Sequence, residues 1–187
     1  MKYSAKVKIL TSLLALLFVM SVDVAWAWSN QILPSDGTTV TVAVEEVDPI
    51  EKYRNAKKLS NDELIDLLKL TGFKGEKLKI AWAVAMREST GRPTSHNDTP
   101  STGDDSYGLF QINMIGTLGS DRIDKFQQNG IQIDTKKQLF DPVVNAQIAF
   151  YMTAKGTNWG SWGYGPHAYD GDPSEPGIEL WISRFSE

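Results

Sequence analysis

The stretch "AWAVAMRESTGRP", residues 81–93, guides the interpretation of the whole chain, because an apolar run ends there in a charged and polar triplet before a Gly and a Pro. The pattern predicts a helix from about Gly75 to Thr90. At about 100° per residue, Glu88 falls on the apolar face of this helix, together with Ala81, Val84 and Ala85. A carboxylate therefore stands on the hydrophobic side of a helix at the point where the helix stops.

This position gives Glu88 a chemical use. A carboxyl group on an apolar face loses water, and desolvation favours its protonated form, so its pKa is expected to rise toward the range of a general acid. The alternative is a glutamate in a frayed last turn that points to solvent. The helix alone leaves both interpretations open.

The segment "SYGLFQIN" (106–113) follows after a loop over residues 91–106 that is rich in Ser, Thr, Asp and Pro. Gly108 lets the backbone approach closely where a side chain would obstruct a ligand. Gln111 and Asn113 can donate and accept hydrogen bonds, which suits sugar hydroxyls and N-acetyl groups. The alternative for this segment is a plain buried turn.

Aromatic residues gather in "NWGSWGYGPHAY" (158–169). Trp159, Trp162 and Tyr164 have flat faces that can stack on sugar rings, and the glycines between them favour an open loop. The alternative is that these aromatics belong to the core, which is where we assign Trp82 and Trp181.

Helices dominate the remaining pattern, and the expected fold class is mainly α. A capping box at Ser60 and Glu63 predicts a helix that ends at Gly72. Residues 140–156 give the clearest helical pattern of the later sequence, with Asp141 as N-cap, Pro142 in the first turn and Gly156 at its end. We expect this helix to be buried on much of its surface. Weaker helical patterns cover residues 119–129 and part of the C-terminal tail.

Four segments in this order resemble the lysozyme-like superfamily, most closely the lytic transglycosylases and phage lysozyme-like domains. The family's Glu–Ser pair stands at Glu88 and Ser89, and its Gly-Leu-Met/Phe-Gln-Ile motif matches "SYGLFQIN". The segments "FDPVVNAQIAFYM" (140–152) and "NWGSWGYGPHAY" are similar to a later family helix and to the aromatic region that closes the cleft. Order and spacing agree over residues 75–170.

The resemblance implies a two-lobed, lysozyme-like fold with a cleft for peptidoglycan glycan strands and no cofactor. Glu88 would be the catalytic acid that cleaves the β-1,4 bond between N-acetylmuramic acid and N-acetylglucosamine. We also expect a monomer. The residues expected to bind substrate are Ser89, Ser106, Tyr107, Gln111, Asn113, Trp159, Trp162 and Tyr164.

The residue before "YG" bears on the outcome of the reaction. Chicken-type lysozymes carry an Asp there, whereas this chain has Ser106, with Asp104 and Asp105 just before it. The difference favours a lytic transglycosylase that forms 1,6-anhydromuramyl products. A hydrolase that uses a displaced carboxylate, Asp105 or Asp98, stays open, as does a non-catalytic wall-binding or virion structural protein. If Asp104–Ser106 is extended, Ser106 in the cleft turns Asp105 away.

The N-terminus indicates export. Residues 1–27 combine three lysines, a twelve-residue apolar core (9–20) and an "AWA" site before Trp28, which is typical of a cleaved secretory signal peptide. The alternative is an uncleaved membrane anchor. We expect residues 28–59 to form an extended leader and residues 60–187 to form the catalytic domain. We expect a periplasmic or secreted protein without a stable membrane span after cleavage, or a virion-associated one if phage-encoded.

Composition excludes other classes of function. A net charge of −4 argues against nucleic-acid binding, and the chain has no cysteine for a thiol nucleophile or a disulfide scaffold. Two histidines, His96 and His167, are expected in loops and do not form a zinc motif. The acidic stretches 98–105 and 170–175 lack EF-hand spacing, so we expect no bound metal.

Overall fold

The structure is a computed structural model that describes residues 47–165 and 177–187. The predicted signal peptide, most of the predicted leader, His167 and the acidic stretch 170–175 lie outside the described residues. In the described part, no helix is long and apolar enough to cross a membrane.

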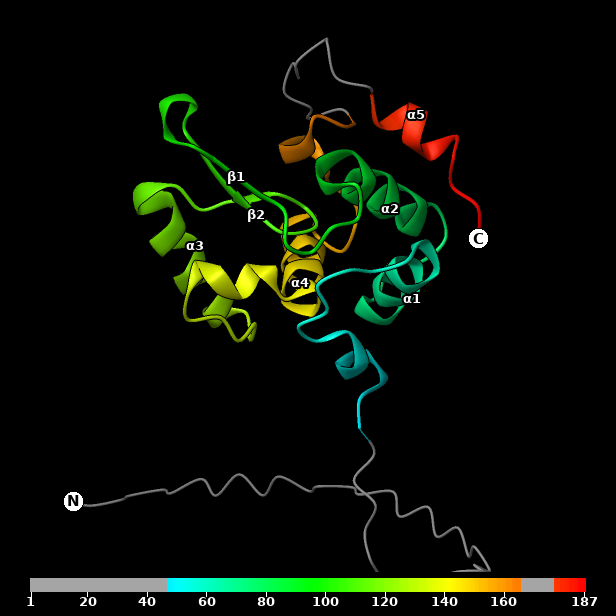
Figure 1. Ribbon diagram of the computed structural model, residues 1–187, viewed down its shortest axis with the longest axis horizontal. Coiled ribbons are helices and arrows are strands. Elements are labelled where there is room, and N and C mark those ends of the chain that lie inside the picture. Colours follow the sequence, from blue (N-terminus) through cyan, green and yellow to red (C-terminus); the bar gives the residue numbers. More distant parts are fainter. Residues whose placement is uncertain (1–46, 166–176) are drawn as a thin grey trace, which may run out of the picture. The chain divides into compact units, whose positions relative to one another are not determined.

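The described fold is mainly α, as predicted (Figure 1). Figure 1 shows α4 between two groups of elements: α1, α2 and α5 on one side, and α3 with the strands on the other. The α-helices are α1 (Asn61–Thr71), α2 (Glu76–Ser89), α3 (Gly116–Gln128), α4 (Pro142–Met152) and α5 (Ile178–Ile182). The strands are β1 (His96–Thr99), β2 (Asp104–Tyr107) and β3 (Ile112–Asn113), and the 3-10 helices are η1 (Pro49–Tyr53), η2 (Pro100–Thr102), η3 (Lys136–Phe140) and η4 (Gly160–Trp162).

Helix α1 begins and ends as its sequence predicts. The Ser60 hydroxyl accepts a hydrogen bond from the Glu63 amide at 3.3 Å, and the Glu63 carboxylate accepts one from the Ser60 amide at 2.7 Å. Gly72 ends the helix in the left-handed region with φ of 117°. Leu64, Leu67 and Leu68 of α1 are buried, so this helix packs its apolar face against α2 and α4.

Helix α2 also follows the prediction and carries the candidate acid at its C-terminal end. Residues 81–85 are buried, and Thr90 caps the helix in the left-handed conformation with φ of 53°. Trp82 is buried as expected, and its indole Nε1 donates to Asn61 Oδ1 at 2.8 Å. Trp181 is half-buried and packs edge-on against Trp82.

The predicted loop over residues 91–106 is wrong in part, because the structure forms a β-hairpin there. Strand β1 pairs antiparallel with β2, which pairs antiparallel with β3. The register joins His96 to Tyr107, so His96 lies on a strand and not in a loop. Both faces of the hairpin carry polar side chains that hydrogen-bond to one another, so the sequence lacks the alternation of apolar and polar residues. That alternation indicates a strand only when one face is apolar, and the strands were therefore not predicted.

Helix α4 is the most buried helix of the fold. Asp141 caps it through a hydrogen bond from the Val143 amide to Oδ1 at 2.9 Å, and Pro142 occupies the first turn, as predicted. The helix ends at Met152, earlier than the predicted end at Gly156. Ala154 and Lys155 adopt positive φ angles, which turns the chain before the glycine is reached.

The packed part of the chain starts before the predicted boundary at Ser60. Pro49–Tyr53 forms η1, and the side chains of Ile50 and Tyr53 are buried in the core. Tyr53 also donates a hydrogen bond from its hydroxyl to Asp66 on α1 at 2.7 Å. Residues 49–59 are therefore attached to the helical domain.

The loop between β2 and β3 is held by one buried amide side chain. Asn145 of α4 is fully buried; its Oδ1 accepts from the Phe110 amide at 3.0 Å, and its Nδ2 donates to the carbonyls of Tyr107 and Leu139 at 2.9 Å each. Gly108 lies against this amide with φ of 75°, and a Cβ there would overlap with both Asn145 and the Leu139 carbonyl. The close approach expected of Gly108 is made toward α4.

We predict that Asn145→Ala lowers the free energy of unfolding by about 3 kcal/mol or more, because it leaves buried backbone groups without partners. Urea unfolding monitored by tryptophan fluorescence measures the change. Gln147→Ala, a half-buried position of the same helix, is the control and should shift stability by about 0.5 kcal/mol or less. A loss below about 1 kcal/mol for the Asn145 variant would contradict the assignment.

Candidate active site

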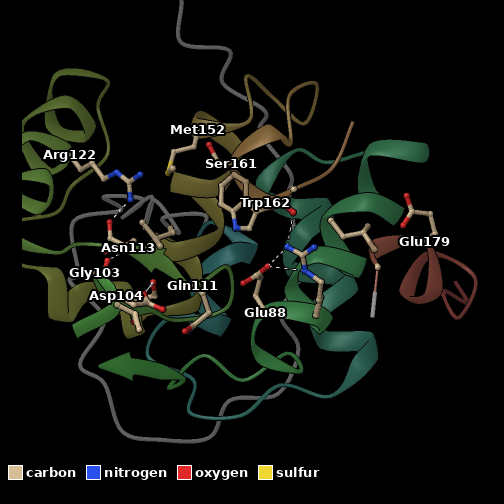
Figure 2. Close-up of a pocket in the computed structure, with 17 residues that line it drawn as sticks. Glu88, Gly103, Asp104, Gln111, Asn113, Arg122, Met152, Ser161, Trp162 and Glu179 are labelled. Carbon is tan, nitrogen blue, oxygen red and sulfur yellow. Dashed lines mark hydrogen bonds and ion pairs between the residues drawn. The ribbon is translucent and has the colours of Figure 1, made fainter. Parts of the chain in front are cut away.

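A groove of about 730 Å³ runs along the end of α2 (Figure 2). Polar and charged side chains from separate parts of the sequence meet in it. Figure 2 shows Glu88 between Arg122 on one side of the groove and Glu179 on the other. The lining side chains include Arg87, Glu88, Asp104, Ser106, Gln111, Asn113, Arg122, Met152, Ser161, Trp162, Ile178 and Glu179.

Glu88 lines this groove, as predicted, and its side chain is 20% exposed. The three residues expected on its face, Ala81, Val84 and Ala85, are fully buried. The surroundings of the carboxylate are less apolar than expected, however. Arg87 donates to Glu88 Oε1 from Nε at 3.0 Å and from Nη2 at 2.5 Å. Burial alone therefore does not set the charge of this group, since a guanidinium stabilises negative charge on it.

Arg87 also ties the acid to the aromatic segment. Its Nη2 donates to the backbone carbonyl of Trp162 at 2.6 Å, and its side chain is 17% exposed. A planar guanidinium with two acceptors has a fixed orientation. The position of Glu88 is thus coupled to η4 through one side chain.

The alternation of β2 decides which of its side chains enter the groove. Asp104 and Ser106 lie two residues apart on one face of the strand, and both line the groove. The Ser106 hydroxyl donates to Asp104 Oδ1, and Asn97 Nδ2 donates to Asp104 Oδ2 at 2.5 Å. A carboxylate therefore shares the groove with Glu88, although it stands two residues before the usual lysozyme position.

Asp105 points to the opposite face of β2, as the extended-strand argument predicts. Its Oδ1 lies 3.0 Å from His96 Nε2, and its Oδ2 accepts from Lys136 Nζ at 2.6 Å. Burial would raise the pKa of Asp105, but hydrogen bonds from Lys136, His96 and Tyr107 outweigh burial and lower it to about 2. Asp105 is an ionised structural carboxylate, not a residue of the groove. Asp98, its exposed partner in the strand register, does not line the groove either.

Tyr107 is placed by the same alternation, and its side chain does not line the groove, although it was expected to bind substrate. Its ring is buried, 4.3 Å from the His96 ring and 5.2 Å from the Phe140 ring, centroid to centroid. It packs the hairpin onto η3. The family motif gives the residue type at this position but not the face of the strand on which the side chain lies.

Gln111 and Asn113, which were expected to hydrogen-bond sugar groups, line the groove. Gln111 has a positive φ of 45°, which is uncommon for a non-glycine residue, and its Nε2 donates to the carbonyls of Ser95 and Gly108 at 3.2 and 2.9 Å. A second hollow of about 360 Å³ shares Glu88 and Gln111 with the groove and also includes Arg92.

The three aromatic residues expected to stack on sugars occupy different environments. Trp159 is 3% exposed and stacks between Phe73 and Phe110, so it belongs to the core and does not line the groove as expected. Trp162 lines the groove but is 6% exposed, and its Nε1 donates to the Phe110 carbonyl at 2.8 Å. Tyr164 is half-buried against the core and does not line the groove.

Ser89, which was expected to bind substrate, makes structural contacts and does not line the groove. It is 3% exposed, and its hydroxyl lies 2.9 Å from the Ala85 carbonyl and 2.8 Å from the Leu109 carbonyl. The side chain following the candidate acid therefore fastens the end of α2 to the loop after β2. Glu88 gains a fixed position from this contact.

A comparison with protein families shows which family the chain belongs to. A profile described as a lysozyme-like domain matches residues 66–164, more than half of the chain. The chain belongs to the lysozyme-like domain family. Searches of curated proteins and of solved structures returned no match. The family is one of peptidoglycan-cleaving glycosidases, and its implied substrate is peptidoglycan.

Several groove residues of this lysozyme-like domain were missed in the sequence. Asp104 could have been found, because it lies two residues from Ser106 on a strand and so shares its face. Arg122, Ser161 and Glu179 carry no local signal, since only the fold brings their elements together. In the described residues, no group of three or more His, Asp or Glu side chains could hold a metal ion.

Removing the charge of Asp105 is predicted to affect stability much more than activity. Its folded-state pKa lies below the unfolded value, so its contribution is present above about pH 4 and is lost as the pH falls toward 2. Asp105→Asn should cost about 2 kcal/mol of unfolding free energy at pH 7, with the difference from wild type shrinking below about pH 4. Activity should fall less than about tenfold.

Urea unfolding between pH 7 and pH 3 measures the difference in stability. The loss of turbidity of a cell-wall suspension measures the activity. Asp98→Asn is the matched control, since this exposed carboxylate faces Asp105 in the strand register. A pH-independent stability difference, or a large loss of activity in a folded Asp105→Asn protein, would contradict the structural role.

Proposed function

We propose that this chain cleaves the β-1,4 bond between N-acetylmuramic acid and N-acetylglucosamine in peptidoglycan, as a lytic transglycosylase. The observation that carries the proposal is the position of Glu88: a half-buried carboxylate at the end of α2, inside a polar groove of a lysozyme-like domain. The substrate lies outside the cytoplasmic membrane, so the activity requires the export that the N-terminal pattern predicts.

In the first step, the carboxyl group of Glu88 gives its proton to the glycosidic oxygen of the departing N-acetylglucosamine. The bond from C1 of the muramyl sugar to that oxygen breaks, and positive charge develops at C1. Arg87 stabilises the carboxylate that Glu88 becomes, because two of its N–H groups already donate to Oε1.

In the second step, the Glu88 carboxylate accepts the proton of the muramyl 6-hydroxyl group, and O6 forms a bond to C1. The product carries a 1,6-anhydro ring, Glu88 regains its proton, and no water is consumed. One carboxyl group can serve both steps because acid and base act in sequence. The orientation that Arg87 and the Trp162 carbonyl impose on Glu88 suits this double role.

Two features of the groove favour transglycosylation over hydrolysis. The position before "YG" holds Ser106, which carries no charge, and Asp105 points away from the groove into an ion pair with Lys136. A hydrolase normally needs a second carboxylate that stabilises the cationic sugar or activates water.

Hydrolysis is the second candidate function, because Asp104 does line the groove. Its two oxygens accept hydrogen bonds from Asn97 and Ser106, which hold the side chain in one orientation. In this alternative, Asp104 assists attack by water at C1, and the product has a reducing muramyl end. The two functions therefore differ in whether water enters the product.

Glu88→Gln is predicted to abolish most of the activity while leaving the fold intact. The glutamine Oε1 can still accept from Arg87, but its amide cannot deliver a proton, so wall-clearing activity should fall by about 10²-fold or more. The melting temperature should stay within a few degrees of wild type. Glu76→Gln, at the exposed start of the same helix, is the matched control. A folded Glu88→Gln protein with near-normal activity would refute the proposed acid.

A further inference from the structure

Arg122 of α3 is a groove residue that the reaction described above does not use. Figure 2 shows its guanidinium beside Asn113, with Glu88 lying between Arg122 and Glu179 on the opposite side of the groove. Its Nη1 donates to the backbone carbonyl of Asn113, which leaves further N–H groups of the guanidinium for other acceptors.

The charge of Arg122 is not balanced by a neighbouring carboxylate. Its side chain is half-buried, and burial lowers its pKa. In the part of the chain that the structure describes, no carboxylate oxygen lies within 4.0 Å of it, whereas Arg87 in the same groove pairs with Glu88. Asp104 also lines the groove, but its oxygens accept from Asn97 and Ser106. A desolvated cation without a counter-charge is costly and calls for an anionic ligand.

The proposed substrate carries such anions on one of its two sugars. Only the muramyl residue bears a lactyl group, which ends in a carboxylate in strands without peptide and leads to the carboxylates of the stem peptide in substituted strands. The N-acetylglucosamine residue has no carboxylate. A guanidinium binds a carboxylate through two parallel N–H···O bonds, so it can distinguish the two sugars.

We propose that Arg122 is a specificity-determining residue that binds a carboxylate carried by a muramyl residue of the strand. This inference rests on the proposed function for the identity of the substrate. Both bonds of the glycan strand are β-1,4 linkages, so an enzyme that cleaves only after the muramyl residue must recognise the lactyl side. A carboxylate held at Arg122 fixes the register of the strand and brings the correct bond to Glu88.

Binding measurements separate this inference from the chemistry. The full chain with Glu88→Gln is titrated by calorimetry with three glycans of equal length: a chitin oligosaccharide, a peptide-free muramyl–glucosaminyl oligomer, and the same oligomer with stem peptides. The oligomers with carboxylates should bind about tenfold more tightly than the chitin oligosaccharide. Tight binding of both oligomers identifies the lactyl carboxylate as the ligand in the peptide-free strand, and tight binding of the peptide-bearing one alone identifies the stem peptide.

Adding Arg122→Gln should remove this preference while leaving the affinity for chitin oligosaccharide nearly unchanged. Arg122→Lys keeps the charge but cannot donate two parallel hydrogen bonds, so it should retain part of the preference. This variant replaces Arg122→Gln in the test if Arg122→Gln does not fold. Arg184→Gln, an exposed arginine beside Trp181 and outside the groove, is the matched control and should keep the preference.

Two results would overturn the inference. A loss of affinity by the same factor for all three glycans would show that Arg122 only supports Asn113. Loss of the preference in Arg92→Gln, and not in the Arg122 variants, would move the carboxylate to the second hollow. Failure of the proposed function is a separate result: the wild-type chain would bind these glycans with the preference but leave peptidoglycan uncleaved.

Discussion

The site depends on the backbone of the loop that follows β2, because side chains from three other elements hydrogen-bond to it. Each of three carbonyls in residues 107–110 accepts from a different buried side chain. The pairs are Tyr107 with Asn145 of α4, Leu109 with Ser89 of α2, and Phe110 with Trp162 of η4. These bonds fix the end of α2, the helix α4 and the aromatic segment to one loop, so the groove exists before substrate binds.

Much of the fold could be predicted because its signals are local. The capping box of Ser60 and Glu63, the N-cap at Asp141 and the apolar face of α2 each act within a few residues of one another. The same holds for Glu88, whose place on a helix face follows from helical periodicity alone. Ser106 in the groove and Asp105 turned away follow from the alternation of an extended strand.

The rest could not be predicted, because it depends on contacts between distant segments. Ser89 and Trp159 have side chains that suit sugars, but the fold uses the first to bond Leu109 and the second to fill the core. Arg87 lies next to Glu88 in sequence, yet its pairing with the acid depends on the Trp162 carbonyl, 75 residues away. Arg122 lies in the groove only because the fold brings α3 and the end of α2 to the same hollow.

The central claim is that Glu88 serves as acid and then as base, without water as a nucleophile. The most direct measurement is mass spectrometry of the muropeptides that the wild-type chain releases from purified peptidoglycan in water labelled with heavy oxygen. The account predicts 1,6-anhydromuramyl ends that contain no label. Reducing muramyl ends that carry heavy oxygen at C1 would contradict it and would identify water as the nucleophile, with Asp104 as the second carboxylate.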